Sequence, residues 1–464
     1  MALAGRDLVT MDDLSIQEME AVFDLADEMA ENMPAQVGVC RGKVMAALFF
    51  EPSTRTRLSF ETAMHRLGGS VISVADASVT SVAKGESLAD MARVVGSYAD
   101  IIVIRHPWEG AAKVVADYAD VPVINAGDGG HQHPTQTLCD LYTLRKERGH
   151  IQGLRIALWG DLKYGRTIHS LIFALAKFGA DILFCPSPGL EVPENIIRKL
   201  VAEYGGQVEK VEGSDTPFPA DAIYMTPSSP HQLAMMPDID AELQLREGVD
   251  ALYVTRPQKE RFQAAEKERD IRAAYPVVDK KLLKRQQFRE TIVMHPLPRV
   301  DELAYEVDAD PRSLYFKQAA RGVPVRMALL ALLLGAREPA RPVPPPAPPS
   351  LPVYRRDSGI RCTNPACVTA QESEKRYIAN EFVLVSREPL TLRCVYCEHG
   401  FQPAFVASTD WHEGKLEYKR YHGARSRWAR DIKPENLVVF ASAADAEARG
   451  YRPGRAQRGK AAEA

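Results

Sequence analysis

A proline-rich run divides the chain into two parts that cannot share one hydrophobic core. Eight of the fifteen residues from Glu338 to Pro352 are proline. Proline has no backbone N–H and its ring fixes φ, so such a run fits neither a helix interior nor the middle of a sheet. It predicts an extended spacer of roughly 45 Å, at about 3.1 Å per residue. The alternative is a proline-rich ligand for another module.

The part before the spacer alternates short apolar runs with amphipathic stretches of helical period. Runs such as KVMAALFFE, DIIVIRHP and LRIALWGD have the length and composition of buried parallel strands, and most lead into a polar or proline-containing loop. This alternation predicts the α/β fold class, with two doubly wound parallel-sheet domains at residues 1–150 and 151–306 and with the helices of residues 307–337 packing back on the first. Ligands of such sheets bind where the carboxyl ends of the strands meet.

The composition is that of a soluble globular protein without a general affinity for polyanions. Hydrophobic residues make up 45% of the 464 residues, charged residues make up 26%, and the net charge is −3. The longest apolar run, Met327 to Gly335, is too short to cross a bilayer, and the N-terminus lacks the apolar segment of a signal peptide. We therefore expect a cytoplasmic protein with neither membrane nor nucleic acid among its partners.

The stretch FFEPSTRTRLSF predicts an anion site. A strand ends at Glu51, and the residues from Ser53 to Thr56 form the first turn of a helix, where backbone N–H groups have no intrahelical partner. Those donors, the hydroxyl groups and the guanidinium of Arg55 suit a bound phosphate. The alternative is a capped helix whose arginines face solvent, but two arginines in a first turn oppose the helix dipole unless an anion is present.

Other predicted loops carry further cations and hydrogen-bond donors. Most of them follow a strand, and together they describe a cavity lined by positive charge. The side chains concerned are Ser81, Lys84, Arg105, His133, Gln136 and Arg166.

Six segments of the first part are similar, in order, to the signature segments of the aspartate carbamoyltransferase catalytic chain. They are FFEPSTRTRLSFETAMHRLGGSV, RHPWEGAA, NAGDGGHQHPTQTLCDL, GDLKYGRTIHSL, YVTRPQKERF and MHPLPRVDEL, and the similarity covers about residues 5–335. The resemblance implies the transfer of a carbamoyl group from carbamoyl phosphate to L-aspartate in pyrimidine synthesis, without a cofactor. It also implies a carbamoyl phosphate-binding domain at residues 1–150, an aspartate-binding domain at residues 151–306, and a homo-oligomer built from trimers that share their active sites.

The resemblance also assigns roles to individual residues. The residues implied to bind carbamoyl phosphate are Ser53, Thr54, Arg55, Thr56, Ser81, Arg105, His133, Gln136, Pro296, Leu297 and Pro298. Those implied to bind aspartate are Lys84, Arg166, Arg256 and Gln258, and those implied to act in catalysis are Arg55, Thr56, Lys84, Arg105 and His133. Ser81 and Lys84 would come from the neighbouring subunit. The physical chemistry agrees, because preorganised donors at a developing oxyanion lower the barrier, by about 3 kcal/mol each.

Two other functions remain as alternatives. An ornithine or other amino-acid carbamoyltransferase would share the STRTR element, but MHPLP lacks the cysteine of the ornithine family and TRPQKER offers cations suited to a dicarboxylate. A non-catalytic scaffold would be expected to have lost one of the key cations, and this chain keeps them. The loop of about residues 225–255 before the aspartate-binding segment is longer than in the shortest family members.

Four of the seven cysteines cluster after the spacer, within residues 353–408. Cys362 and Cys367 are separated by four residues, and Cys394 and Cys397 by two. Two such pairs suit a structural Zn²⁺ held by four thiolates, with disulfides or an iron or redox site as the alternatives. The absence of a secretion signal argues against disulfides, and four thiolates leave no open position for catalysis.

The cysteine segment also resembles the zinc domain of the aspartate carbamoyltransferase regulatory chain. The resemblance includes Asn364 between the first two cysteines. It implies a module that docks against catalytic chains and serves assembly. The larger effector domain of that regulatory chain would precede the module, where this chain has only the spacer, so we expect no ATP or CTP site of that type.

The mildly basic tail, residues 409–464, resembles loosely a small metal-binding module of methylphosphotriester DNA repair proteins. Ser426, Gly454 and Gln457 stand where that pattern has cysteines, so we expect no second zinc site. An interaction module is the prediction and nucleic-acid contact the alternative, and the last residues are expected to be disordered.

Overall fold

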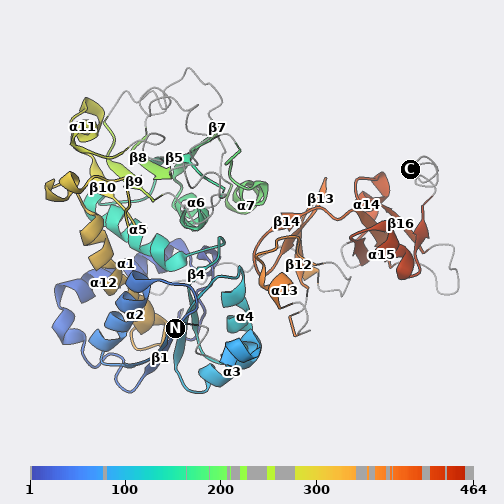
Figure 1. Cartoon of the computed structure of the whole chain (residues 1–464), viewed down its shortest axis with the longest axis horizontal. Coiled ribbons are helices and arrows are strands. Elements are labelled where there is room, and N and C mark those ends of the chain that lie inside the picture. The colour runs from blue at the N-terminus through green and yellow to red at the C-terminus, as the bar shows by residue number, and fades with distance from the viewer. Residues whose placement is uncertain are drawn as a thin grey trace.

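The computed structural model describes most of the chain in detail. The residues covered are 3–76, 81–163, 165–187, 189–205, 209–210, 220–226, 248–256, 277–340, 353–354, 361–372, 377–378, 380–409, 419–433 and 436–454. Most of the expected spacer, most of the long loop near residues 225–255 and the last ten residues of the tail lie outside this set. Figure 1 shows two α/β domains stacked on one side and two smaller units beside them. None of the described helices is long and apolar enough to cross a membrane.

The first domain is built on a parallel four-stranded sheet in the order β2-β1-β3-β4. Its central strands are apolar and almost entirely buried because helices cover both faces. The strands are β1 (Val44–Phe49), β2 (Ser70–Val74), β3 (Ile101–His106) and β4 (Val123–Asp128). The helices are α1 (Ile16–Glu31), α2 (Thr54–Arg66), α3 (Leu88–Gly96), α4 (Ala111–Tyr118) and α5 (Pro134–Arg148), with 3-10 turns η1 (Met11–Asp13), η2 (Met33–Gln36) and η4 (Ser81–Lys84).

The second domain has a parallel sheet in the order β10-β9-β8-β5-β6-β7. Its strands are β5 (Arg155–Gly160), β6 (Asp181–Pro186), β7 (Glu209–Lys210), β8 (Ala222–Thr226), β9 (Ala251–Val254) and β10 (Ile292–Met294). Its helices and turns are α6 (Arg166–Lys177), α7 (Glu194–Tyr204), α11 (Lys280–Leu283), η7 (Gln286–Phe288) and η8 (Tyr305–Ala309). The chain then returns through α12 (Tyr315–Leu333), which packs against α1, α2 and α5 of the first domain.

The strand orders locate the place where a ligand should bind. In the first sheet the chain order reverses between β1 and β3, and in the second it reverses between β5 and β8. Crevices form at the carboxyl ends of strands at such switch points. β1 leads into the STRT turn and β3 carries Arg105 near its end, so the switch point of the first sheet presents the predicted anion site.

Two small sheets follow the α/β domains: the first is antiparallel, and the second is mixed because β16 and β18 pair in parallel. The cysteine unit, residues 353–401, contains β11 (Val353–Tyr354), β12 (Phe382–Arg387), β13 (Leu390–Cys394), β14 (Gly400–Phe401) and α13 (Val368–Gln371). The C-terminal unit, residues 405–454, contains β15 (Phe405–Ser408), β16 (Arg420–Gly423), β17 (Leu437–Phe440), β18 (Arg452–Pro453), α14 (Arg427–Asp431) and α15 (Ala443–Ala448), with the sheet order β17-β15-β16-β18.

Strand pairing moves one boundary that the sequence analysis placed after Ser408. β15 pairs with β16 and β17, and its Ala407 packs with Tyr421 and Phe440 in the core of the C-terminal unit. β15 therefore belongs to the C-terminal unit, and the boundary lies between Phe401 and Phe405.

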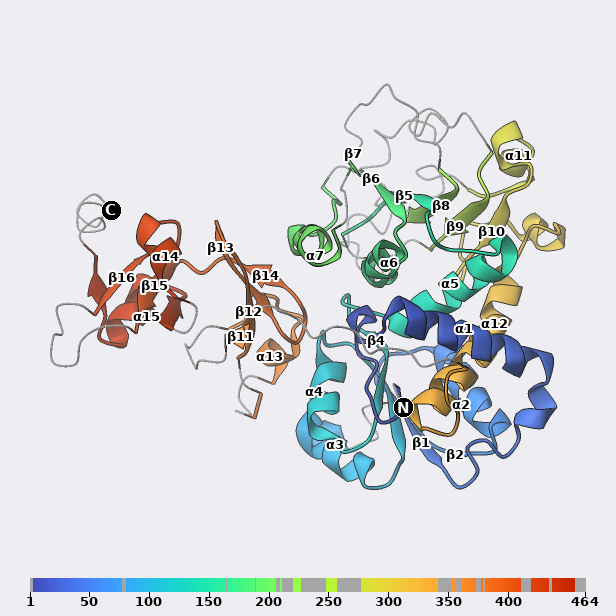
Figure 2. The same cartoon turned by 180° about the vertical axis from the view of Figure 1, so that it is seen from behind.

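The cysteine unit packs directly against the α/β domains, as the two opposite views in Figures 1 and 2 show. Ile102 of β3 and Ala112 of α4 belong to the same buried apolar cluster as Phe382 and Leu392 of the cysteine unit. The backbone of Glu109 also forms two hydrogen bonds with the cysteine segment: its N–H donates to Ala366 O at 2.9 Å, and its carbonyl accepts from Val368 N at 2.9 Å. The C-terminal unit lies farther from the α/β domains (Figure 1).

Candidate active site and metal centre

The first turn of α2 leaves its donors free for a ligand. Ser53 stands at the N-cap position, but its side chain makes no capping hydrogen bond. The hydroxyl groups of Ser53, Thr54 and Thr56 thus accompany N–H groups that lack intrahelical partners. Arg55 extends from this turn to the loop after β10, where its Nη2 donates to Leu297 O at 2.6 Å. In geometry and charge, the turn suits the predicted anion.

A buried arginine and a half-buried arginine share one carboxylate beside this turn. Arg105 is 6% exposed, and its Nη2 lies 3.2 Å from Glu51 Oε1. Arg166, from the start of α6, lies with its Nη1 2.9 Å from Glu51 Oε2 and 2.9 Å from Gly129 O. Burial and the charge of Arg166 lower the pKa of Arg105 to about 10. Burial would raise the pKa of Glu51, but the two guanidinium groups outweigh it and lower that pKa. The two arginines and Glu51 together therefore carry a net positive charge.

His133 adds a neutral donor to the same cavity. It stands at the N-cap of α5, and its backbone N–H donates to Ser170 Oγ at 2.8 Å. Burial, followed by the charges of Arg105 and Arg166, lowers its pKa well below the usual 6.5. Gly127 makes room here, with φ +114° and a position where a Cβ would lie 3.1 Å from Arg105 Nη1. His133 is therefore an uncharged imidazole. It can donate a hydrogen bond to a ligand, while the arginines supply the positive charge that attracts an anion.

The loop after β10 is held in a strained conformation. Leu297 has a φ of +57°, in the left-handed region that few non-glycine residues adopt. The loop is fixed by hydrogen bonds of His295, whose Nδ1 accepts from Leu297 N at 2.7 Å and whose Nε2 lies 2.8 Å from Glu302 Oε1. Gln318 Oε1 accepts from His295 N at 2.9 Å. These hydrogen bonds hold the loop so that Leu297 O meets Arg55 of the first turn of α2.

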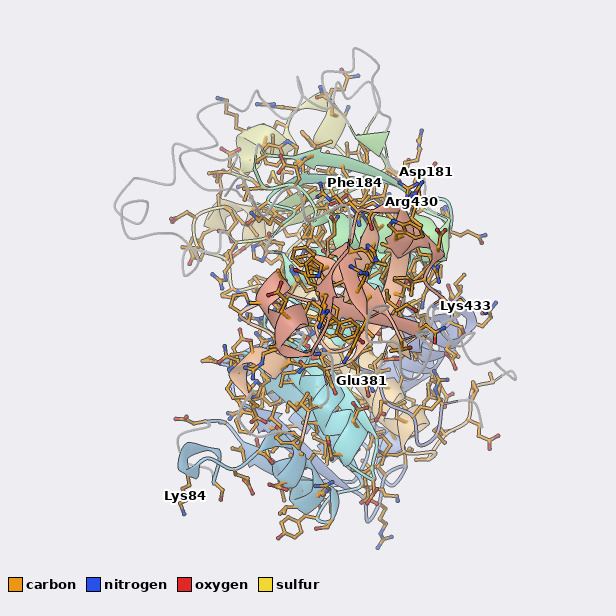
Figure 3. The ribbon with its side chains drawn as sticks, turned by 90° about the vertical axis from the view of Figure 1, so that its right-hand side faces the viewer. Lys84, Asp181, Phe184, Glu381, Arg430 and Lys433 are labelled. Atoms are coloured by element: carbon orange, nitrogen blue, oxygen red, sulfur yellow. The ribbon has the colours of Figure 1, made fainter. Side chains whose placement is uncertain are left out.

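These segments enclose one cavity of about 500 Å³ at the junction of the two α/β domains. The predicted site residues that line it are Ser53, Thr54, Arg55, Thr56, Arg105, His133, Gln136, Arg166, Arg256, Pro296, Leu297 and Pro298. Ser81 and Lys84 do not line it: both are exposed on η4, and Figure 3 shows Lys84 at the edge of the first domain. Gln258 lies outside the described residues.

Several residues that line the cavity were not singled out from the sequence. They include Cys139, Tyr224, His295, Gln318 and Arg326. A signal existed for Arg326, because it is the single charge in the apolar run GVPVRMALLALL, and a charge inside an apolar helix is a functional candidate. Its Nη1 lies 3.4 Å from Cys139 Sγ and 3.1 Å from Gly322 O. Burial raises the pKa of the Cys139 thiol, so this cysteine is neutral.

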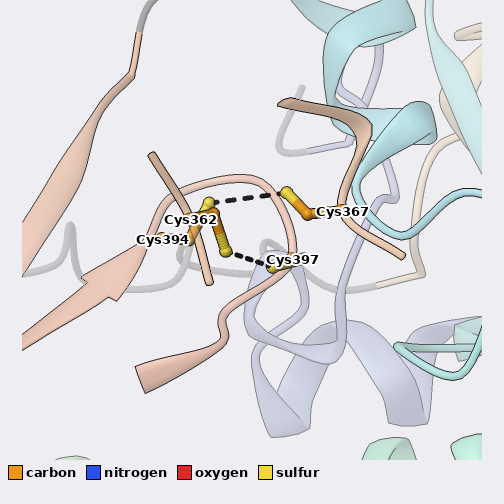
Figure 4. A group of neighbouring side chains, drawn as sticks. All are labelled: Cys362, Cys367, Cys394 and Cys397. Carbon is orange, nitrogen blue, oxygen red and sulfur yellow. Dashed lines mark hydrogen bonds between the residues drawn. The ribbon is translucent and has the colours of Figure 1, made fainter. Parts of the chain in front are cut away.

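The four clustered cysteines form a closed metal site (Figure 4). Their Sγ atoms all lie within 4.8 Å of one another, and all four residues are buried. Sγ of Cys362 and Cys397 are 3.5 Å apart, and those of Cys367 and Cys394 are 3.9 Å apart. Four sulfurs about 2.3 Å from a tetrahedral Zn²⁺ would be about 3.8 Å apart, whereas a disulfide needs about 2.05 Å. The thiols fit a four-coordinate metal.

Glu398 joins this metal site to both α/β domains. It follows Cys397 directly, adopts a φ of +56°, and forms an ion pair with Lys199 of α7 in the second domain. Its Oε2 also lies 3.1 Å from His131 Nε2 and accepts from Gln132 Nε2 at 2.6 Å in the first domain. Beside it, Arg393 Nη1 pairs with Glu203 Oε1 at 2.7 Å, and Arg198 donates to Thr391 at 2.7 Å. The cysteine unit thus bridges the two domains.

Comparison with known families identifies the two α/β domains. Residues 6–146 match the family model described as "Aspartate/ornithine carbamoyltransferase, carbamoyl-P binding domain", and residues 152–333 match the corresponding "Asp/Orn binding domain". The aspartate carbamoyltransferase catalytic subunit of Thermoplasma acidophilum is 46% identical over 335 residues, which are 72% of this chain and 99% of that protein. The catalytic subunit of Thermococcus kodakarensis is 48% identical over 334 residues, 71% of this chain and 97% of that protein. The chain belongs to the aspartate/ornithine carbamoyltransferase family.

Solved structures of carbamoyltransferases have the same fold. The catalytic subunit of M. jannaschii aspartate transcarbamoylase is 44% identical with a TM-score of 0.58, over 71% of this chain and 98% of that chain. Aspartate transcarbamoylase from Trypanosoma cruzi, solved in complex with carbamoyl phosphate and aspartate, is 35% identical with a TM-score of 0.59, over 72% of this chain and 98% of that chain. Both confirm the predicted pair of parallel-sheet domains.

The cysteine unit extends this carbamoyltransferase beyond its catalytic part. Residues 357–405 match the model described as "Aspartate carbamoyltransferase regulatory chain, metal binding domain". The match and the four-cysteine cluster together confirm the predicted metal-binding domain. One chain therefore combines both α/β domains of the family with a metal-binding domain of the regulatory-chain type.

Proposed function

We propose that this chain is an aspartate carbamoyltransferase that converts carbamoyl phosphate and L-aspartate into N-carbamoyl-L-aspartate and phosphate, in cytoplasmic pyrimidine synthesis. The observation that carries the proposal is the cavity between the two α/β domains. Five guanidinium groups, a neutral imidazole and the N-terminus of α2 converge there, with Glu51 paired to two of the arginines. Such a cavity suits two anionic substrates held side by side.

The mechanism follows from where the donors lie. The first turn of α2 and Arg55 bind the phosphate group, while Arg105 and His133 donate to the carbonyl oxygen of the carbamoyl group. When the neutral amine of aspartate attacks the carbonyl carbon, that oxygen becomes an oxyanion, and preorganised donors stabilise it. The C–O bond to phosphate then breaks, and the departing phosphate accepts the proton of the amine. Holding both substrates in line supplies the remaining rate enhancement.

The choice of aspartate over ornithine rests on charge. Arg166 and Arg256 stand on the second-domain side of the cavity, where they suit the two carboxylates of aspartate. The side-chain ammonium of ornithine would require an anion instead, and Glu51 is already shared between Arg105 and Arg166. The names of the two relatives and two solved structures given above also favour aspartate.

We further propose that a second copy of the chain completes each active site. Ser81 and Lys84 are exposed at the edge of the first domain, away from the cavity of their own chain (Figure 3). Their supply from a neighbouring subunit would add a cation to the aspartate site and would build a homo-oligomer from trimers. Each subunit would give the element to one neighbour and receive it from the other, and such a head-to-tail interface forms a ring when its rotation closes.

The metal of the cysteine unit is Zn²⁺ with a structural role in this proposal. Four buried thiols at the observed spacings match its coordination and leave no open position. The metal orders the turn that carries Glu398, so it supports docking and assembly. Catalysis itself requires no cofactor.

The test is a steady-state assay of carbamoyl transfer with the purified full-length chain. We expect N-carbamoylaspartate to form, and ornithine to be a poor acceptor; preferential carbamoylation of ornithine would refute the assignment.

Arg55→Ala should lower turnover by orders of magnitude while the fold remains intact, and near-normal turnover at saturating substrates would contradict its role.

Mixing subunits tests the shared site. Arg55→Ala and Lys84→Ala chains should each be inactive alone, but hybrids that contain both should regain activity, because one interface then carries no substitution. Hybrids that stay inactive would show that each chain forms its site alone.

A further inference from the structure

We propose that Asp140 is a positioning residue that orients the side-chain amide of Gln136 and thereby selects the amino group of carbamoyl phosphate. The inference rests on the proposed function and adds that the amino group meets Gln136 and the backbone carbonyls of the loop after β10, both of which line the cavity. It concerns how the site distinguishes a carbamoyl phosphate from another acyl phosphate of the same size, such as acetyl phosphate.

Asp140 is a buried acid whose oxygens are occupied by neutral donors. It lies one helical turn after Gln136 on α5 and is 1% exposed. Its Oδ1 accepts from Gln136 Nε2 at 2.8 Å and from Gln318 Nε2 at 2.7 Å, and its Oδ2 accepts from Tyr253 Oη at 2.9 Å. Within the described part of the chain no cation lies within 4.0 Å of it. A buried carboxyl without an ion pair is costly and calls for a role other than charge pairing.

A single oxygen that accepts from two amides fixes the direction of both. Each glutamine must turn its NH₂ group toward Asp140 Oδ1, so each carbonyl oxygen points away from it. Gln318 shows this arrangement within the protein, because its Oε1 accepts from His295 N at 2.9 Å. Gln136 lines the cavity, and among the described residues no donor is within hydrogen-bond distance of its Oε1. That oxygen is left as an acceptor for an N–H of the substrate.

The same carboxyl also supports the second acceptor for the amino group. Through Gln318 it holds His295 N, and His295 in turn holds Leu297 N in the loop that lines the cavity. The two N–H bonds of a carbamoyl group thus meet acceptors that one aspartate organises. An acetyl group offers a methyl instead and would leave these acceptors without a donor, which a buried polar site rejects strongly.

The arrangement is independent of the protonation state of Asp140. Burial raises the pKa of Asp140 to about 7, against the three donated hydrogen bonds and the charge of Arg326. When a proton is bound, Oδ2 is its place, because Tyr253 Oη can accept it, whereas Oδ1 faces two NH₂ groups. Oδ1 remains an acceptor in both states. Asparagine can reproduce this pattern with its oxygen toward the glutamines and its NH₂ toward Tyr253.

Two phosphonates of nearly equal shape test the inference: phosphonoacetamide, which carries the NH₂ group, and acetonylphosphonate, which carries a methyl in its place. Dissociation constants are measured by calorimetry with the full-length chain. We expect the wild-type protein to prefer the amide, Asp140→Asn to keep most of that preference, and Asp140→Leu to lose it by about tenfold or more with unchanged affinity for the ketone. Tyr253→Phe, which removes only the third donor, is the matched control and should keep the preference.

The outcomes separate this inference from the proposed function. A wild-type chain that binds neither phosphonate would refute both. Wild-type binding of both without preference, or Asp140→Leu binding with the wild-type preference, would refute the role of Asp140 alone. An equal loss of affinity for both ligands in Asp140→Leu would show a purely structural role and would also refute it. Should Asp140→Leu not fold, Asp140→Ser takes its place. The loss of preference for the amide in Asp140→Ser should not add to that in Gln136→Leu when the two substitutions are combined, because both act on the same side-chain amide.

Discussion

His131 and His133 lie two residues apart in one loop, and both are buried, yet their pKa values shift in opposite directions. Burial would lower the pKa of His131, but Asp128 and Glu398 raise it well above 6.5. Burial lowers the pKa of His133 well below 6.5, and among the charges Arg105 adds most to the effect. The loop therefore separates two charged environments of opposite character.

The difference between the two environments distinguishes a binding site from a structural joint. The joint is the interface between the cysteine unit and the two α/β domains. On the His131 side, the cations of the cysteine interface meet carboxylates within the chain, as in the pairs of Lys199 with Glu398 and of Arg393 with Glu203. On the His133 side, positive charge exceeds negative charge, so an anion from outside stabilises it. Each prediction below perturbs one side and asks whether the other responds.

The largest expected effect is that of removing the metal, which acts on the His131 side. Four buried thiols converge at spacings that suit a metal, and metal binding of this type contributes about 10 kcal/mol or more to folding. We expect chelation to unfold the cysteine unit and disturb assembly, with a smaller loss of activity. Hydrogen exchange, oligomer mass and the transfer assay measure the three quantities. Activity abolished at unchanged oligomer mass would contradict the separation.

The next effect compares one arginine from each side. Arg105→Gln should lower kcat/KM by about a thousandfold, because a donor at the developing oxyanion is lost, and should leave thermal stability without ligand unchanged or higher. Arg393→Gln should leave turnover near normal and lower stability by roughly 1–3 kcal/mol, since Glu203 loses its partner. The transfer assay measures kcat/KM of both variants, and thermal unfolding measures their stability. The comparison fails if the two variants behave alike.

A smaller effect is expected for Glu398→Gln, which keeps the shape of the joint but removes its shared charge. His131 and Lys199 would lose a buried counterion, although Asp12 still pairs with Lys199. We expect a loss of about 3 kcal/mol in docking of the cysteine unit, measured as faster hydrogen exchange in β13 and α7. Adding Lys199→Met should recover part of it. Unchanged exchange would mean that apolar packing alone holds the joint.

More of the cavity lining than of the interface of the cysteine unit could be predicted from the sequence, and the reason is physical. Phosphate sites use a local device, a strand followed by a helix N-terminus with hydroxyls, so Ser53 to Thr56 could be read directly. Strand-end residues such as Arg105, His133 and Arg166 converge because parallel strands share one carboxyl edge. The resemblance to a family then supplied the roles, and the cavity brings these residues together.

The partners across the joint could not be predicted, because they depend on docking between segments far apart in the sequence. Nothing in CEHGF indicates that Glu398 meets Lys199 and His131, which lie about two hundred residues or more away. Gln318 and Asp140 were missed for the same reason, since glutamine and aspartate on helices are ordinarily solvated. Arg326 could have been noticed as a lone charge in an apolar helix. The shift of the domain boundary to before β15 shows that strand pairing, rather than composition, defines the small units.

The smallest effect is the pH dependence of stability, which tests directly whether His131 and His133 lie in environments of opposite charge. A histidine with a raised pKa, such as His131, stabilises the fold fully below pH 6.5, and this contribution is lost as the pH rises through its folded-state pKa. For His133 the sign is reversed: below pH 6.5 the unfolded chain binds a proton that the folded chain does not, so stability falls by about 1.4 kcal/mol per pH unit on acidification. Thermal unfolding from pH 5 to 8 should therefore lose its alkaline slope in His131→Gln and its acidic slope in His133→Gln. If both substitutions remove the pH dependence of stability on the same side, acidic or alkaline, the two histidines share one environment. The distinction between site and joint is then lost.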